Sequence, residues 1–465
     1  MKSLIVILID LCIVLGSIWF SFNLLGTSGR LIDYSYNLQA FETVLPLIVV
    51  FYLFYIYVFG LYNDTRNRLP QVIYTVFLIS IALMMSIMAT CFLVSYQALS
   101  FPRSVILLSA CFYFIFLALW RAVVWKAAKK RHGVKNVCII GDKEGMLSKG
   151  LVYKHQDIYH IRYSCRENDP DLQRKINNSD EIFISSNVTG DVRERIIDWC
   201  VEENKEVYFV PKYTDISIMN SVLKKTDDIP TFNISKLELS MEERFVKRCF
   251  DLFFASVGFI LALPVGLVLA ALVKMDKGPA FYSQERLTKD GRKFKVHKFR
   301  TMVPHAEKLS GPVLAGEDDP RITRVGRFIR AIRMDELPQI LNILKGDMSI
   351  VGPRPERPFF ASQFEGDVPE YRHRLKVKAG LTGLAQIMGK YNTDASQKLR
   401  YDLIYINKYS LFQDFLIVLK TVKILFLKES TEGVVAEEKF NPIHTEATHI
   451  KIREEYKPVH KTVRL

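Results

Sequence analysis

Four long apolar runs fill the start of this 465-residue chain and restrict the folds open to it. They cover roughly Leu4–Leu25, Val44–Tyr62, Val72–Tyr96 and Val105–Trp125. Each is close to the roughly 20 residues that an α-helix needs to cross a bilayer. The first run is too long for a cleaved signal peptide, lacks a small-x-small cleavage site and precedes three more runs. Residues 1–130 are therefore predicted to form an α-helical transmembrane bundle of four helices.

Basic residues predict the orientation of this bundle. The stretch after the fourth run, Lys126 to Lys135, is rich in lysine, and the loop between the second and third runs carries Arg66 and Arg68. By the positive-inside rule, both ends of the bundle face the cytoplasm. Asp10 lies within the first run, where an acid is either functional or structural. Its position near the cytoplasmic end favours a structural or interfacial role.

The charge balance indicates what the chain binds. Lysine and arginine together number 63 against 49 acidic residues, a net charge of +14. This excess fits an anionic membrane surface or a phosphate-bearing substrate. Nucleic acid is disfavoured as a partner, because no basic motif interleaved with aromatic residues is present. The seven cysteines show no metal-binding spacing and the nine histidines are scattered, which fits a reduced compartment and disfavours a zinc site.

Residues 131–240 alternate between short apolar strands and helical stretches, the pattern of a small parallel α/β domain. Expected strands are Val137–Ile140, Glu181–Ser185 and Val207–Val210, with a helix at Val192–Glu203. The turn after the first strand, residues 141–145, lacks the second glycine of the dinucleotide-binding fingerprint. Asp142 also puts negative charge where a phosphate would bind. The sequence thus favours a degenerate Rossmann-like, nucleotide-binding-like domain with a structural or regulatory role over an active cofactor site.

A further apolar run, Leu252 to Val273, is interrupted by Pro264 and flanked there by Gly258 and Gly266. Two structures fit this pattern. One is a bent helix that crosses the membrane completely. The other is a helix that bends at Pro264 and returns to the side from which it entered, with protein burying the freed backbone groups. The run alone does not separate them.

The hexapeptide 333–338, Arg-Met-Asp-Glu-Leu-Pro, places two adjacent carboxylates at a predicted helix start. An apolar stripe at helical spacing follows it: Leu337, Ile340, Leu341 and Leu344. Pro338 fits only a first helical turn, where its missing N–H breaks no hydrogen bond. Asp335 and Glu336 would then lie at the positive end of the helix dipole, which favours their ionised forms. Taken alone, the pair is better explained as ordinary helix-capping acids.

The surroundings of the hexapeptide are rich in arginine and lysine set among turn-forming residues. Such residues are suited to a polyanion, because the planar guanidinium binds phosphate through two hydrogen bonds. The basic segments lie at 296–302, 319–330, 345–349, 351–355 and 378–386.

These segments resemble the bacterial sugar transferase family, the polyprenyl-phosphate glycosyl-1-phosphate transferases. The family's motifs K-F-R-[ST]-M, D-P-R-[IV]-T-x-x-G-x-x-[IL]-R, D-E-L-P-Q, K-G-[DE]-M-S-x-[IV]-G-P-R-P and G-[IL]-T-G-x-x-Q occur in that order between Glu242 and Leu427. The layout also resembles the family's long form, which includes undecaprenyl-phosphate glucose and galactose phosphotransferases. Leu384 departs from the pattern, since many members carry tryptophan there, which puts local packing or a substrate contact in doubt.

The resemblance implies a reaction: transfer of a sugar-1-phosphate from a UDP-sugar to undecaprenyl phosphate, with release of UMP, to initiate exopolysaccharide, capsule or O-antigen synthesis. By position, Asp335 resembles the nucleophile that forms a phosphosugar–aspartyl intermediate. Glu336 resembles the ligand of a Mg²⁺ cofactor. The candidate phosphate contacts are Lys298, Arg300, Arg333 and Arg354, and the candidate nucleotide contacts are Thr382 and Gln386.

The resemblance also implies an architecture. Residues 241–430 would form a mainly α, membrane-associated catalytic module, with a re-entrant helix over 250–273 broken at Pro264. The acceptor lipid would place this module on the cytoplasmic face of a bacterial inner membrane, in contact with membrane lipid. Leu411–Leu427 is expected to form a surface helix on the membrane or on the core, and residues 431–465 a flexible tail.

Two other functions fit parts of the sequence. A nucleotide-sugar-modifying enzyme would depend on the middle domain, whose broken glycine pattern disfavours it. A non-catalytic membrane regulator of polysaccharide synthesis could use the transmembrane runs and the basic surface alone, but the intact Asp335–Glu336 pair among arginines disfavours that. The transmembrane runs and the middle domain also offer surfaces for a homodimer. The sugar is not identified by these residues.

Overall fold

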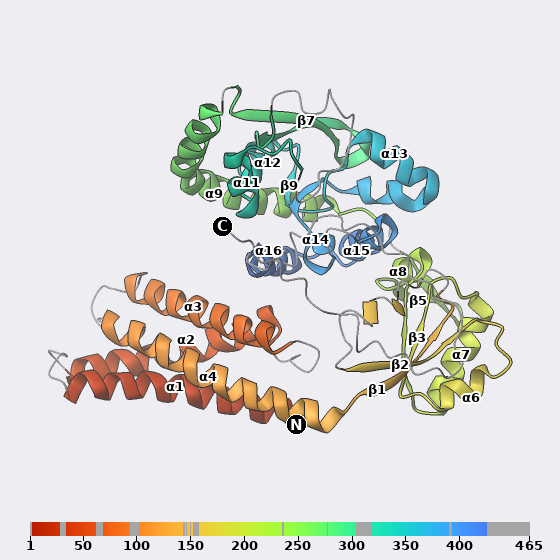
Figure 1. Ribbon diagram of the computed structural model, residues 1–465, viewed down its shortest axis with the longest axis horizontal. Helices are drawn as coiled ribbons and strands as arrows, with labels where there is room; N and C mark the ends of the chain where they lie inside the picture. The colour runs from red at the N-terminus through yellow and green to blue at the C-terminus, as the bar shows by residue number, and fades with distance from the viewer. Residues whose placement is uncertain are drawn as a thin grey trace, which may run out of the picture. The chain divides into compact units, whose positions relative to one another are not determined.

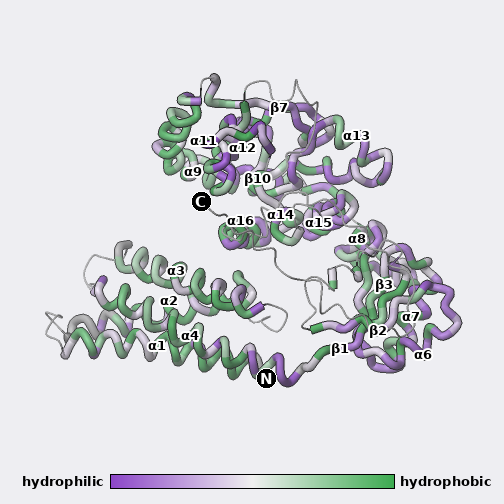
Figure 2. Tube along the Cα trace, in the orientation of Figure 1, coloured by the Kyte–Doolittle hydropathy of each residue, from purple (hydrophilic) through white to green (hydrophobic). Residues whose placement is uncertain are grey.

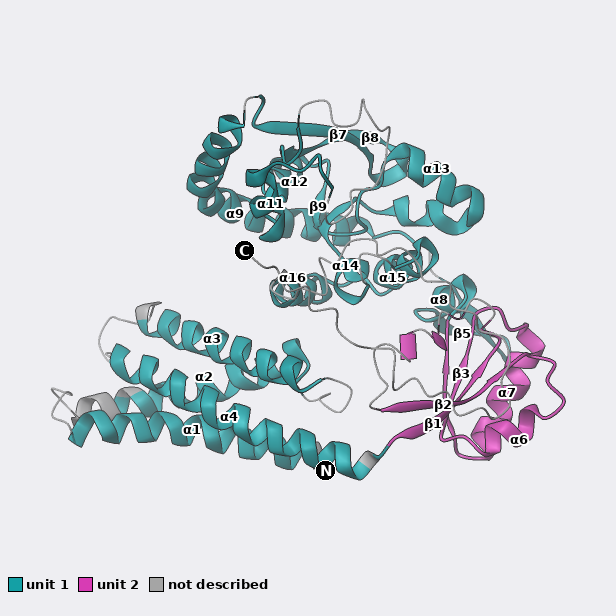
Figure 3. Ribbon diagram, viewed as in Figure 1, with its two compact units in different colours: residues 1–133, 211–435 teal, residues 134–210, 436–465 magenta. Residues whose placement is uncertain are grey.

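The computed structural model describes residues 2–27, 34–61, 68–93, 102–142, 145, 147–148, 150–151, 158–234, 237–276, 278–303, 319–389 and 393–425 (Figure 1). The chain divides into two compact units, which Figure 3 distinguishes by colour. One unit contains residues 1–133 and 211–435, and the described part of the other is within residues 134–210. The predicted tail, 431–465, lies outside the described residues.

The four N-terminal runs form helices, as predicted. They are α1 (Lys2–Thr27), α2 (Tyr34–Phe59), α3 (Leu69–Leu93) and α4 (Arg103–His132), and each is long and apolar enough to span a membrane. One face of each helix is buried in a common core around Ile18, Ile48 and Leu83. The opposite faces are also apolar: Trp19 and Leu119 are 58% and 62% exposed, and the four helices are predominantly green in Figure 2. A helix that is apolar all round is suited to lipid.

Asp10 on α1 is fully buried, and its carboxylate accepts hydrogen bonds from the guanidinium of Arg121 on α4. Arg121 also donates to the carbonyl oxygen of Leu61, just beyond the end of α2, at 3.1 Å. The acid in the first apolar run is therefore neutralised by a basic residue of the fourth. This pairing agrees with the structural role predicted for Asp10.

The smaller unit contains a four-stranded parallel sheet with the strand order β2-β1-β3-β4. Its strands are β1 (Lys135–Ile140), β2 (Tyr159–Cys165), β3 (Glu181–Ile184) and β4 (Glu206–Phe209), joined through α6 (Leu172–Asn177) and α7 (Gly190–Glu202). The mixed α/β region is thus confirmed. Its core contains Ile140, Ile182 and Ile196. At the end of β1, the Asp142 carboxylate accepts hydrogen bonds from the backbone N–H groups of Leu147 and Ser148 at 3.2 and 2.8 Å.

The α/β unit ends at Val210, whereas the sequence suggested residue 240. The segment that follows contains α8 (Tyr213–Ile218) and a hairpin of β5 (Val222–Thr226) and β6 (Ile229–Asn233). Ile216 and Leu239 are buried in the same apolar core as Leu399 of the transferase-like region, and Arg400 Nε donates to the carbonyl oxygen of Pro211 at 2.9 Å. Packing therefore joins this segment to the module that follows it.

The module from residue 241 is mainly helical. It contains an antiparallel hairpin of β7 (Phe281–Leu287) and β8 (Lys293–Phe299), whose turn holds Asp290 and Gly291 at positive φ, and a parallel pair of β9 (Ser349–Val351) and β10 (Gly380–Thr382). Its helical segments are α9 (Met241–Met275), η2 (Lys289–Gly291), α11 (Arg324–Ala331), η3 (Met334–Glu336), α12 (Gln339–Lys345), α13 (Pro358–Asp367), η4 (Pro369–Lys376), α14 (Leu384–Met388), α15 (Ala395–Asn407) and α16 (Leu411–Leu425). The expected surface helix, α16, packs on the module's core through Ile417, which is 2% exposed.

The long helix α9 contains Pro264 in its interior, and its axis changes direction along its length (Figure 1). Proline removes one backbone hydrogen bond and thereby permits such a bend. Ala255 packs against Phe294 and Val296 of β8, and Val273 packs in a cluster with Phe299 at the end of the same strand. Between these two contacts, Ile260 and Leu261 are 69% and 71% exposed. Both halves of α9 thus pack against one module, while the part between them presents apolar side chains outward.

Candidate active site

The two adjacent carboxylates lie on a short 3₁₀ turn, η3, directly before α12. Arg333 precedes the turn in the left-handed conformation, with φ of 54°, which non-glycine residues adopt rarely and at a cost. Met334 and Leu337 anchor the turn by packing against the cluster that contains Val273 of α9. Asp335 and Glu336 are therefore held one turn before the helix that the sequence predicted, with side chains 17% and 21% exposed.

Two basic residues from different parts of the module converge on this turn. Lys298 Nζ, on β8, lies 2.6 Å from Glu336 Oε1 and 3.9 Å from Asp335 Oδ2. Arg354 Nη2, in the loop after β9, lies 2.9 Å from the same oxygen of Glu336. Segments 38 and 18 residues away from Glu336 are thus brought together around it. Four of the predicted site residues meet here.

The site shifts the protonation of the two acids in opposite directions. Burial raises the pKa of Asp335; the positive charge of Lys298 opposes this rise, and the negative charge of Glu336 adds to it. Burial would also raise the pKa of Glu336, but the charges of Arg354 and Lys298 outweigh it and lower that pKa. Opposite shifts in neighbouring acids are typical of pairs with different chemical roles. Glu336 is therefore the more acidic carboxyl group of the pair, and Asp335 is the more basic one.

Arg333 belongs to the same electrostatic neighbourhood. Burial lowers the pKa of its guanidinium, and the negative charges of Glu336 and Asp335 act in the opposite direction. Its left-handed backbone sets the direction in which the chain enters the acidic turn. The structure therefore places Arg333 at the site, as the sequence predicted.

The loop that carries Arg354 depends on three glycines where backbone segments nearly touch. A Cβ on Gly352, Gly380 or Gly383 would collide with backbone atoms of the facing segment. These contacts hold β9 beside β10, with Gly352 N donating to the Thr382 carbonyl oxygen at 2.8 Å. The glycines of the G-P-R-P and G-L-T-G segments thus serve close packing that presents Arg354 to Glu336.

The remaining predicted contacts lie elsewhere. Arg300 is 7% exposed and donates to the carbonyl oxygens of Val273 and Asp276 at the end of α9, at 3.0 and 3.4 Å. Thr382 Oγ1 is 2.7 Å from Thr421 Oγ1 on α16. Gln386 Nε2 donates to the Leu381 carbonyl oxygen at 3.0 Å, while its buried Oε1 has no hydrogen-bond partner among the described residues. The structure gives Arg300 a helix-capping position and does not group these three residues with the acidic pair.

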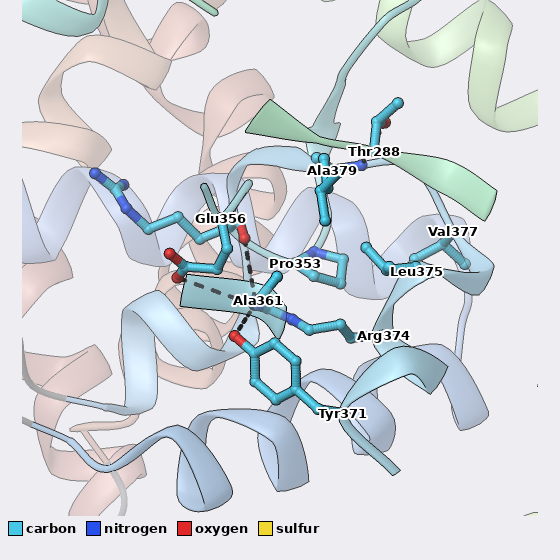
Figure 4. A pocket seen from close by; sticks show the side chains of 11 residues that line it. Thr288, Pro353, Glu356, Ala361, Tyr371, Arg374, Leu375, Val377 and Ala379 are labelled. Carbon is cyan, nitrogen blue, oxygen red and sulfur yellow. Dashed lines mark hydrogen bonds and ion pairs between the residues drawn. The ribbon is translucent and has the colours of Figure 1, made fainter. Parts of the chain in front are cut away.

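Two basic residues near the site were missed by the sequence reasoning. Arg330 on α11 donates to Thr301 Oγ1 at 2.9 Å, and its charge acts to lower the pKa of Asp335. The signals for Arg330 were its place at the end of the motif at 319–330 and its position three residues before Arg333. Arg374 on η4 lines, together with Arg354, a small cavity with room for about one water molecule. Figure 4 shows Arg374 with Glu356 and Tyr371 at this cavity. No sequence pattern connected it with the acidic turn.

The acidic pair also suits a hard divalent cation. Magnesium is commonly held by one or two carboxylates together with substrate phosphates, so a full protein cage is not required. In keeping with this, the described residues contain no group of three acidic, histidine or cysteine side chains suited to a metal. Lys298 and Arg354 both contact Oε1 of Glu336, so neither contact uses Oε2. Asp335 and Glu336 therefore fit Mg²⁺ as partial ligands.

Comparison with known proteins gives the region a family. The model of the bacterial sugar transferase family matches residues 242–428. A putative undecaprenyl-phosphate N-acetylgalactosaminyl 1-phosphate transferase of Bacillus subtilis is 50% identical over 131 residues, which cover 28% of this chain and 73% of that protein. Residues 242–428, which the family model matches, include η3, Lys298 and Arg354, so the family match and the geometry concern the same site.

Longer relatives align over a smaller share of their length. A UDP-N-acetylgalactosamine-undecaprenyl-phosphate N-acetylgalactosaminephosphotransferase of Aeromonas hydrophila is 37% identical over 50% of this chain and 54% of its own. An undecaprenyl-phosphate galactose phosphotransferase of Salmonella typhimurium is 32% identical over 54% of this chain and 58% of its own. The chain thus spans little more than half the length of these two relatives. From the family match and the acidic site within it, we conclude that this chain belongs to the bacterial sugar transferase family.

Proposed function

We propose that this protein transfers a sugar-1-phosphate from a UDP-sugar to undecaprenyl phosphate, releases UMP and so initiates the synthesis of a polysaccharide repeat unit. The observation that carries the proposal is the Asp335–Glu336 pair, with Glu336 held by Lys298 and Arg354 at 2.6 and 2.9 Å. This is an acidic turn inside a basic site, as transfer of a phosphoryl group requires. The names of the relatives support the acceptor, since they act on undecaprenyl phosphate.

In the first half of the proposed reaction, an Asp335 carboxylate oxygen attacks the phosphorus that carries the sugar. The bond from that phosphorus to the UMP oxygen breaks, and UMP leaves with the electron pair. In the second half, an oxygen of undecaprenyl phosphate attacks the same phosphorus, which releases Asp335 and forms the lipid diphosphate sugar. No proton transfer to a base is needed, because both attacking groups are anions.

The basic residues lower the cost of bringing anions together. Lys298 lies close to both carboxylates, and Arg354 and Arg333 add positive charge where the diphosphate would bind. A bound Mg²⁺ would neutralise further charge on the diphosphate oxygens. Glu336, whose lowered pKa keeps it ionised, would hold that ion and leave Asp335 for attack.

We further propose that α9 is re-entrant and that the module lies on the cytoplasmic face of a bacterial inner membrane. The support is the contact of both halves of α9 with one module: Asp251 Oδ1 accepts from Ser349 Oγ at 2.9 Å, and Arg300 donates to the carbonyl oxygen of Val273. A full crossing would separate these ends by the thickness of the hydrocarbon core, about 30 Å. Re-entry also puts the site at the surface where a lipid phosphate resides.

For the smaller unit we propose a Rossmann-like fold that serves structure or regulation. Its parallel order β2-β1-β3-β4 supports such a fold. The Asp142 carboxylate accepts hydrogen bonds from the backbone N–H groups of residues 147 and 148 after β1. Backbone N–H groups at such a position are the donors that bind phosphate in nucleotide-binding domains. A negative charge bonded there opposes the binding of a dinucleotide. A homodimer, formed through the transmembrane helices or the smaller unit, is a separate proposal that a measurement of the protein's mass in solution would test.

The test measures UMP release by purified protein with undecaprenyl phosphate, Mg²⁺ and a panel of UDP-sugars. Because relatives are named for N-acetylgalactosamine, galactose and glucose, the panel contains UDP-linked forms of all three and of N-acetylglucosamine. We expect release with at least one donor. Asp335→Asn should abolish both release and a covalent phosphosugar adduct detectable by intact-mass spectrometry, because the amide is a poor nucleophile.

The outcomes of this test separate the candidate functions. Turnover by Asp335→Asn at the wild-type rate would remove the nucleophile assignment. Absence of UMP release by the wild-type protein with every donor would instead favour the non-catalytic regulator. A modified nucleotide sugar without UMP release would favour the nucleotide-sugar-modifying enzyme.

A further inference from the structure

The loop that carries Arg354 is held from outside through successive carbonyl oxygens. The Pro353 carbonyl accepts from Gly380 N at 2.9 Å, and the Pro355 carbonyl accepts from Arg286 Nη1 at 3.2 Å. Glu356 is bound through its own carbonyl, which accepts from Leu287 N at 3.0 Å. Prolines on both sides of Arg354 cannot donate a backbone hydrogen bond. The loop is therefore fixed by donors that reach it from other elements.

The carbonyl oxygen of Arg354 itself accepts from Arg374 Nη2 at 3.0 Å. Arg374 is 4% exposed, and its guanidinium is fixed on its other sides. Asp402 on α15 accepts from Nε and Nη2 at 3.0 and 2.8 Å, and Nη1 donates to the Tyr371 hydroxyl. Figure 4 shows Arg374 beside Glu356 and Tyr371, with a dashed line from its guanidinium to the Tyr371 hydroxyl. A planar guanidinium saturated in this way is a rigid donor.

The side chain of Arg354 contrasts with this anchored backbone. It is 47% exposed and still meets Glu336 Oε1 at 2.9 Å. A long, solvated side chain keeps such an ion pair in one geometry only if its own backbone is fixed, because an exposed pair alone contributes about 0–1 kcal/mol. Displacement of a reacting group by about 1 Å can reduce the rate about 100-fold. The anchoring of the Arg354 backbone thus bears directly on the acidic turn.

We propose that Arg374 is a positioning residue that acts through Arg354, with Asp402 fixing the Arg374 guanidinium. This inference rests on the proposed function, because it assigns Arg374 a role in the reaction at Asp335 and Glu336. Arg374 touches neither carboxylate of the turn in the described contacts. Its effect on transfer passes through the backbone of Arg354.

Arg374→Lys is the informative change, because it keeps a cation opposite Asp402. One ammonium group cannot reproduce the fork that bonds Asp402, Tyr371 and the Arg354 carbonyl together. Arg400→Lys is a matched control. Arg400 is 9% exposed, lies on the same helix as Asp402, and donates to the Pro211 carbonyl oxygen, far in sequence from the Arg354 loop. Both changes disturb a buried guanidinium–carbonyl bond, but only one of them anchors Arg354.

The experiment is a double-mutant cycle on UMP release with Arg374→Lys, Arg354→Gln and the combined variant. We expect Arg374→Lys to lower kcat about tenfold, as loss of a supporting contact typically does, with KM for the UDP-sugar changed less than about twofold. In the Arg354→Gln background the same change should lower kcat by less than about twofold, because the group it positions is gone. Arg400→Lys should reduce kcat by the same small factor in both backgrounds.

Equal loss of kcat from Arg374→Lys in both backgrounds would overturn the inference while leaving the transferase function intact. So would a loss no larger than that of Arg400→Lys. Thermal melting of the four proteins needs no substrate. It therefore tests the role of Arg374 even if the wild-type protein is inactive and the proposed transferase function is wrong. If Arg374 anchors Arg354, the Tm losses of Arg374→Lys and Arg354→Gln combine to less than their sum; strictly additive losses would contradict the anchoring.

Discussion

At the scale of single residues, the site assigns different environments to two neighbouring acids. Lys298 and Arg354 both bind one oxygen of Glu336. Asp335 lies farther from Lys298, with Oδ2 at 3.9 Å from the ammonium nitrogen. The same cations therefore keep Glu336 ionised and leave Asp335 the stronger base. These unequal distances, within one 3₁₀ turn, support the proposed division between a metal-binding Glu336 and an attacking Asp335.

Glu336→Gln tests the metal half of this division. The amide keeps the size of the side chain but loses its charge, so we expect the Mg²⁺ concentration for half-maximal UMP release to rise by about tenfold or more, with a lower maximal rate. Asp347→Asn is the control. Asp347 is a 7% exposed acid of the same module that pairs with Arg292 at 3.1 Å. Its Mg²⁺ titration should match that of the wild type. An unchanged midpoint in Glu336→Gln would remove the ligand role.

The sequence predicted the acidic pair and its closest basic partners but could not direct every side chain. Lys298 lies on β8, where strand geometry orients it. Arg300 follows the last residue of that strand, so the alternation of side chains no longer applies to it, and it turns to the end of α9 instead. Arg374 was not predicted as a site residue. Its proposed role depends on a hydrogen bond to the backbone carbonyl of Arg354, and every residue has such a carbonyl, so the sequence does not mark the partner.

At the scale of elements, close backbone contacts decide which helices can approach the site. Gly326 on α11 faces the backbone of Thr301, and a Cβ at this position would overlap the Thr301 carbonyl. Thr323 caps the same helix by accepting from Gly326 N at 3.0 Å. Because η3 follows α11 directly, the packing of α11 against Thr301 also sets the position of the acidic turn.

Gly326→Ala should destabilise the protein by about 1–3 kcal/mol, the usual cost of overpacking a close contact. Gly366→Ala is the matched control, since Gly366 is also helical and has open space around its Cα. There alanine should be neutral or stabilise by up to about 1 kcal/mol. Thermal melting of both variants checks this. A Gly326→Ala protein as stable as Gly366→Ala would show that α11 can move away from Thr301 at no cost.

Elements with a strong period could be predicted, and elements defined by their partners could not. The strands at Val137–Ile140, Glu181–Ser185 and Val207–Val210 and the helix at Val192–Glu203 correspond to β1, β3, β4 and α7. The edge strand β2, Tyr159–Cys165, was missed, because the predicted strands were continuous apolar runs, whereas β2 alternates between apolar and polar residues. The β5–β6 hairpin was missed too, since its residues are almost all exposed and no buried face marks them.

At the scale of the whole molecule, the path of α9 would fix the side of the membrane on which the proposed reaction takes place. Single cysteines at Glu242 and Lys274, both exposed residues near the ends of α9, test its path in a background without the exposed Cys12, Cys111 and Cys249. If the helix re-enters, a membrane-impermeant thiol reagent should label both positions only from the cytoplasmic side. A cysteine at Ser28, between the first two apolar runs, is the control for labelling from outside.

Labelling of the two α9 positions from opposite sides would establish a complete crossing and contradict re-entry. The sequence alone left these paths open, because a proline within an apolar run bends either kind of helix. The packing of both halves of α9 on one module is the long-range observation that supports the proposed re-entry. The family's acidic motif could be located from the sequence, but its distance from the membrane depends on this packing.

The buried pair of Asp10 and Arg121 has a consequence for how the bundle is made. Asp10 belongs to the first apolar helix to leave the ribosome, and Arg121 to the fourth. An acid in a lone membrane helix raises the free energy of insertion, by roughly 2.5–3.5 kcal/mol at the helix centre and by less toward an end. Helix α1 carries the smaller cost until α4 supplies the guanidinium. The fourth helix of the bundle thus supplies the cation that pairs with the acid of the first. A bundle interrupted after α3 retains that acid without its cation.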